Sequence, residues 1–208
     1  MQIITVLWGI SILLAVLGGI PYAIWMVRSA MRKNWRKVGI LVVLPLGFFA
    51  LLAGTTVIVE FYAQGQYVKN TYDSQGDLGD PIFKYDPERS FNGDGVSLYI
   101  FELPAPIRQR FGSPDTRLKS DFPKRPHYRD GWSEVSWTEA PLREEHKKYF
   151  AFALYASSTH TQDLLEALSR AGTFYSFFHY DHGDHPGNVD FFVVDLEAGR
   201  IYEINVNT

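Results

Sequence analysis

Three histidines and two aspartates lie within seven consecutive residues near the end of the chain: His179, Asp181, His182, Asp184 and His185. Imidazole nitrogens and carboxylate oxygens are common ligands of zinc and other divalent metals in proteins, and a turn can bring several of them to one point. The segment therefore has the residue types of a metal site.

The same segment also has the composition of an ordinary hairpin loop. Gly183, Pro186 and Gly187 lie among or beside the candidate ligands, and His, Asp and Asn are common in polar turns. Metal sites usually take ligands from more than one element and hold them with further side chains. We therefore predict a solvated loop and no cofactor, with a divalent-metal site such as zinc and a pH-responsive loop as the alternatives.

Other motifs of catalysis are absent or incomplete. Glu144-Glu145-His146 resembles part of the inverted zinc-protease motif, but position 142, which must be His in that motif, is Leu142. The chain has no G-x-S-x-G elbow, no P-loop and no G-x-G-x-x-G fingerprint. It has no cysteine, which excludes thiolate ligands, a cysteine nucleophile and disulfides. No catalytic residue is predicted.

The 179–185 segment lies between two predicted strands of an antiparallel meander. Apolar patterns bounded by turn residues predict strands at 96–103, 173–180, 189–196 and 200–207 and helices at 142–157 and 162–170. The last three strands form the meander. Elements grouped in this way indicate an α+β domain at 96–208, with the helices on one face of an antiparallel sheet.

Two further segments connect these elements. Residues 104–111 have prolines at their start and predict one or two helical turns. Residues 112–132 are rich in proline, aromatic and charged residues and predict an ordered loop. Residues 64–95 are polar and rich in Gly, Asp, Asn and Ser, which predicts a linker or an irregular lead-in to the domain.

Residues 1–63 are expected to form a transmembrane helical hairpin. Two uncharged apolar stretches, about 3–27 and 38–59, are long enough as helices to cross a hydrocarbon core of about 30 Å. No basic residue precedes the first stretch, and its apolar run is longer than that of a signal peptide. A cleaved signal peptide is therefore not predicted.

The basic residues of the first 63 positions all lie between these stretches, in residues 28–37: Arg28, Arg32, Lys33, Arg36 and Lys37. No Asp or Glu precedes Glu60. Because basic residues accumulate in cytoplasmic loops, we expect this loop to be cytoplasmic. The amino terminus and the large domain would then both be extracytoplasmic.

The charge of the large domain is hidden by the whole-chain value of -3. All 23 acidic residues and 15 of the 20 basic residues lie outside the loop, which gives the rest of the chain a formal charge of -8. Nucleic-acid binding requires clustered Lys and Arg, so no nucleic-acid partner is predicted. The expected partners are the lipid bilayer and a protein on the extracytoplasmic side.

The layout of a short hairpin anchor and a small acidic domain resembles that of several kinds of bacterial envelope proteins, including immunity proteins that neutralise toxins in the periplasm. This resemblance implies a multi-pass inner-membrane protein that binds a protein partner without catalysis, as a toxin-immunity protein or a subunit of an envelope complex. The alternative is a metal-dependent envelope enzyme that uses the His179–His185 loop. A sensor would need another chain for its output, because the cytoplasmic loop is too short to hold a signalling domain.

Overall fold

The structure is a computed structural model that describes residues 2–88, 90, 94–124, 131–155 and 160–208. Residue contacts divide the chain into two compact units, Met1–Ala63 and Gln64–Thr208. Each unit has its own contacts and is described by itself.

The first unit contains helix α1 (Gln2–Met31) and the larger part of helix α2 (Trp35–Tyr72). Two polar contacts join the two helices among the residues that the structure describes. Trp8 Nε1 donates a hydrogen bond to Thr56 Oγ1 at 3.2 Å, and the Tyr22 hydroxyl donates to the carbonyl oxygen of Leu41. The Leu41 side chain is buried at this second contact.

Among the described residues, α2 is the one helix that is long and apolar enough to cross a membrane. Its most apolar stretch is not buried by the rest of the protein. Large apolar side chains are exposed along it, including Ile40, Leu44, Leu46, Leu51, Val57 and Ile58.

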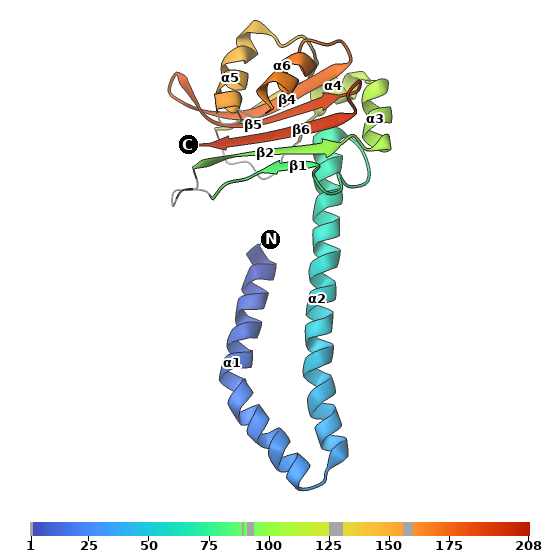
Figure 1. The fold of residues 1–208 in the computed structure, drawn as a ribbon, viewed down its shortest axis with the longest axis vertical. Coiled ribbons are helices and arrows are strands. Elements are labelled where there is room, and N and C mark those ends of the chain that lie inside the picture. Colours follow the sequence, from blue (N-terminus) through green and yellow to red (C-terminus); the bar gives the residue numbers. More distant parts are fainter. Residues whose placement is uncertain (1, 89, 91–93, 125–130, 156–159) are drawn as a thin grey trace. The chain divides into compact units, whose positions relative to one another are not determined.

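The second unit is an α+β fold built on a six-stranded antiparallel sheet in the order β1-β2-β6-β5-β4-β3 (Figure 1). The strands are β1 (Phe83–Tyr85), β2 (Gly95–Glu102), β3 (Ser133–Glu139), β4 (Thr173–His182), β5 (His185–Asp195) and β6 (Arg200–Asn207). The predicted meander is confirmed, since β4 pairs with β5 and β5 with β6. The strand predicted at 96–103 is β2.

Helices α5 (Lys147–Tyr155) and α6 (Thr161–Ala167) cover one face of the sheet (Figure 1). A short 3-10 helix, η1 (Glu144–His146), leads into α5. The buried side chains of both helices pack with alternate strand residues in one apolar cluster, which includes Phe150, Leu164, Phe177, Phe191 and Ile204.

The opposite face of the sheet is also covered by helices. Helices α3 (Ala105–Gly112) and α4 (Thr116–Asp121) and the last turns of α2 pack in a second apolar cluster. Its largest members include Tyr72, Phe111, Trp137 and Phe192. The expectation that the helices lie on one face is therefore wrong. Successive residues of β4 and β5 are both buried, so both faces of these strands need apolar cover.

Four segments differ from the sequence-based expectation, and one of them is β1, which lies in the expected linker. Residues 64–72 are helical rather than a linker, because Val68 and Tyr72 supply an apolar side that the sheet buries. Residues 112–132 include α4, and residues 125–130 of this segment lie outside the described residues. Strand β3 was not predicted.

Candidate functional site

Two of the five candidate metal ligands, His179 and Asp181, face α5. The Tyr149 hydroxyl of α5 donates a hydrogen bond to Asp181 Oδ2 at 2.9 Å. The Tyr149 and His179 ring centroids are 4.1 Å apart, and His179 Nδ1 lies 3.3 Å from Asp181 Oδ1. These two side chains therefore belong to the contact between β4 and α5.

The other three candidates lie at the tip of the β4–β5 hairpin and are exposed. His182 and His185 face each other across the strands, and the turn between them holds Gly183 at a φ of 65° and Asp184. The His182 ring lies so close to Gly187 that a side chain at this glycine would collide with it. The ring is thus held over the hairpin backbone.

The five candidates do not converge on one point. Alternation along β4 places His179 and Asp181 on one face of the strand and His182 on the other, where its ring centroid lies 5.1 Å from that of Tyr180. Across the described part of the chain, no group of three or more His, Asp or Glu side chains is arranged to hold a metal ion. The divalent-metal alternative therefore remains a prediction without a ligand arrangement in the described residues.

Two histidines flank Phe177 beneath α5. The His146 and His179 ring centroids lie 5.1 Å and 5.7 Å from that of Phe177. His146 Nδ1 is 3.0 Å from the Tyr175 hydroxyl. Burial lowers the pKa of both imidazoles from the ordinary value, and the neighbouring carboxylates offset this effect only in part.

This arrangement predicts that acid destabilises the domain. The unfolded chain takes up a proton at each histidine near pH 6.5, about the ordinary pKa, whereas the folded chain does so only at lower pH. The histidine contribution to stability should therefore fall as the pH drops below about 6.5 and level off below the folded pKa values. Carboxylates with a lowered pKa, such as Asp115, add a further loss at more acidic pH. Urea unfolding of the full chain across this range measures the slope.

The pH prediction has a matched set of variants. His146→Gln and His179→Gln should each flatten the slope, because glutamine keeps hydrogen-bonding capacity and does not titrate. His185→Gln changes an exposed side chain at the hairpin tip and should leave the slope unaltered. An equal slope in all four proteins would contradict the prediction.

A groove of about 510 Å³ runs beside β3, the strand at one end of the sheet. It is lined by the continuous run 134–139 together with Lys119, Arg143 and His146. Side chains of both charge signs therefore border it. Part of the edge of β3 is already paired, because the main-chain N–H of Trp137 donates to the Phe122 carbonyl oxygen at 3.1 Å. The groove can accommodate an extended polar chain alongside an edge strand.

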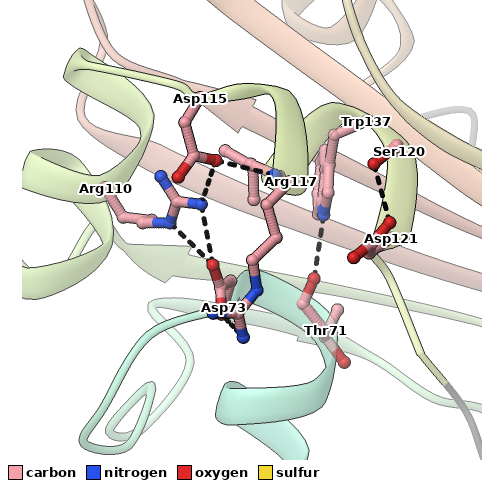
Figure 2. A network of polar contacts seen from close by, with 9 residues as sticks. Thr71, Asp73, Arg110, Asp115, Arg117, Ser120, Asp121 and Trp137 are labelled. Carbon is pink, nitrogen blue, oxygen red and sulfur yellow. Dashed lines mark hydrogen bonds and ion pairs between the residues drawn. The ribbon is translucent and has the colours of Figure 1, made fainter.

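Figure 2 shows a network of polar contacts that fixes the end of α2 to α3 and α4. Asp73, the first residue after α2, accepts hydrogen bonds from Arg110 Nε at 2.9 Å and Nη2 at 2.7 Å, and from Arg117 Nη2 at 3.2 Å. Arg110 Nη2 also donates to Asp115 Oδ1 at 2.6 Å. The hydrogen bonds from Arg110 and from the Leu118 N–H lower the pKa of Asp115.

A second polar cluster lies on the same sheet face as α3. Glu203 Oε1 accepts hydrogen bonds from the Tyr67 and Tyr72 hydroxyls, each at 2.6 Å. Asn205 donates to Asp190 beside them. Tyr67, Glu203, Asp190 and Asn205 border a cavity of about 300 Å³. Because both tyrosines belong to the last turns of α2, Glu203 holds these turns against β6.

Comparison with known proteins finds no matching family model, no matching curated protein and no matching solved structure.

Sequence patterns located His179 and Asp181 but missed their partner Tyr149 and the groove beside β3. Val135 and Trp137 are the two large apolar residues of β3, but they pack in different apolar clusters, because the strand has an irregularity between Val135 and Thr138. No element is predicted for residues 133–139, because the run is short and follows the segment 112–132, which is expected to be a loop.

Proposed function

We propose that the chain is a membrane-anchored, non-enzymatic protein-binding module of the bacterial envelope. The observation that carries the membrane anchoring in this proposal is the exposed apolar surface of α2. Leu46, Leu51 and Ile58 are 65%, 72% and 68% exposed. Exposing this much contiguous apolar surface to water would cost free energy. The 38-residue helix is longer than the hydrocarbon core is thick, so it can cross a bilayer. The lipid chains would then cover the exposed apolar side chains.

The proposed anchor is a hairpin of α1 and α2, with the basic loop in the cytoplasm. The 30-residue length of α1 and its two polar contacts with α2 support a pair of spans. Five Lys and Arg residues at 28–37 and no acidic residue before Glu60 support the orientation. The α+β domain would then be extracytoplasmic.

This orientation predicts opposite results for two reporter fusions in cells. A reporter at Lys33 should be active only if it functions in the cytoplasm, and one at Thr208 only if it functions outside. Paired alkaline phosphatase and fluorescent-protein fusions measure both positions. A cytoplasmic signal at Thr208 would overturn the orientation.

The proposed contact surface is the groove beside β3. An edge strand can pair with an extended segment of a second protein, which obtains affinity from main-chain hydrogen bonds and specificity from side-chain pockets. Glu134 and Arg143 border this groove with opposite charges. They would favour a partner segment that places a basic residue at Glu134 and an acidic residue at Arg143. The partner class is a toxin or another subunit of an envelope complex.

Affinity capture with the full chain tests this proposal. The double charge swap Glu134→Lys/Arg143→Glu should abolish recovery of a specific partner without changing the net charge. Asp80→Lys/Lys84→Glu makes a matched swap near β1, at the other end of the sheet, and should retain the partner. If no protein is recovered above background, or if both swaps behave alike, the proposed binding surface is wrong.

A further inference from the structure

We infer that the first turns of α2 form a binding site for an anionic phospholipid. This inference rests on the membrane anchoring proposed above and adds a ligand class to it. The site is a groove of about 530 Å³ on the helix surface, lined by Trp35, Arg36, Gly39, Ile40, Val43 and Leu44.

The groove follows from residue spacing on α2. Its residues form three successive pairs, 35/36, 39/40 and 43/44, which recur every four positions and therefore lie along one side of a helix. Gly39 lacks a side chain in the middle of this side, and no atom lies within 4 Å of the position that a Cβ would occupy there. The missing side chain leaves a depression between its neighbours.

This side of α2 points away from α1. Leu41, which is 5% exposed, lies at the contact with Tyr22 of α1. At 100° per residue, the groove residues are centred on the opposite side of α2 from Leu41. Val43 is 66% exposed. In a membrane the groove would therefore face lipid.

Charge at the Arg36 end of the groove fits an anionic headgroup. The Arg36 guanidinium can bind a phosphate through two parallel hydrogen bonds. The groove also begins at the amino terminus of α2, where the helix dipole favours negative charge. Four further basic residues lie in the same ten-residue segment: Arg28, Arg32, Lys33 and Lys37.

The other end of the groove, at Val43 and Leu44, fits an acyl chain. Ile40, Val43 and Leu44 are 58%, 66% and 66% exposed and continue the groove along the helix. Trp35, which is 69% exposed, borders the charged end, where an indole suits the interface between headgroups and hydrocarbon. A charged end followed by an apolar side matches a phospholipid better than a free phosphate or a soluble anion.

Fluorescence quenching of Trp35 tests the site in the full chain. Nanodiscs contain equal mole fractions of phosphatidylcholine and phosphatidylglycerol, with one of the two brominated near the headgroup at a time. Trp35→Phe supplies the background from the other tryptophans. Brominated phosphatidylglycerol should quench the Trp35 component about fivefold more strongly than brominated phosphatidylcholine.

Two variants should remove this preference. Arg36→Gln removes the proposed phosphate ligand, and Gly39→Leu fills the depression. Lys37→Gln removes the same charge from the loop at a residue that does not line the groove, so it should keep most of the preference. Each variant is compared with its own Trp35→Phe background.

Three results would overturn the inference. Equal quenching by the two lipids would show that Trp35 contacts the bilayer without lipid selection, which leaves the membrane anchor standing. Equal losses in Arg36→Gln and Lys37→Gln would show diffuse electrostatic attraction in place of a site. Quenching by neither lipid would place Trp35 outside the membrane, and the proposed anchor would then fail together with the lipid site.

Discussion

Replacing Trp137 with alanine is expected to destabilise the α+β domain by about 3–5 kcal/mol, the usual range for truncating a buried large aromatic side chain. Trp137 is 1% exposed. Its ring centroid lies 4.8 Å from that of Phe111 in α3 and 5.6 Å from that of Tyr72 in α2. Its Nε1 donates to the Thr71 carbonyl oxygen at 2.8 Å. One side chain therefore connects β3 with two helices.

Urea unfolding of the full chain in mild detergent, followed by near-ultraviolet circular dichroism, measures this loss. Trp137→Phe keeps an aromatic ring in the core and removes the indole donor to the Thr71 carbonyl oxygen. Its loss of stability should therefore be smaller than that of Trp137→Ala. Leu165→Ala shortens a side chain of the same domain that is 47% exposed and should cost about 1 kcal/mol or less. Similar effects of Trp137→Ala and Leu165→Ala would contradict the described core.

Replacing Asp73 with asparagine is expected to cost about 2–3 kcal/mol. Asp73 has a φ of 49°, a conformation that asparagine also tolerates, so the substitution adds no backbone strain. It removes the negative charge that Arg110 and Arg117 share. Because the Asp73 and Arg110 side chains are only 14% and 18% exposed, solvent and salt should screen this loss little.

An exposed ion pair provides the comparison. Lys147 Nζ and Glu144 Oε2 are 2.6 Å apart, but their side chains are 58% and 84% exposed. Lys147→Gln should therefore cost less than about 1 kcal/mol, and added salt should reduce the cost further. The urea midpoints of both variants at low and high salt measure the contrast. Equal losses would show that burial of the Asp73 network has no energetic consequence.

The C-terminal half of the sheet could be predicted because its signals are local. Residues 173–207 alternate apolar runs with turn residues such as Gly199, whose φ of 67° suits a glycine. Strand β3 and the helical end of α2 could not be predicted in the same way. Val135 and Trp137 give β3 only two large apolar residues, and Tyr67, Val68 and Tyr72 lie in an otherwise polar segment.

The candidate site shows the same limit. Sequence spacing placed five His and Asp residues within one short segment, which made a shared ligand set conceivable. Strand alternation then separated His179 from His182, and α5 contributed Tyr149 from about 30 positions earlier in the chain. The spacing of the His and Asp residues does not show the alternation or the contact from α5. Both depend on the extent of β4 and on the helix that packs against it.

The sequence by itself determined the apolar stretches, the basic segment at 28–37, the acidic remainder and the three-stranded meander, since each depends on the composition or periodicity of neighbouring residues. Only the tertiary structure decided that helices cover both faces of the sheet. The same is true of the contacts that Glu203 and Asp73 make with side chains distant in sequence. The physical reason is that burial of the second face of β4 and β5 requires apolar groups from α2, α3 and α4, and no local pattern specifies which segments will supply them.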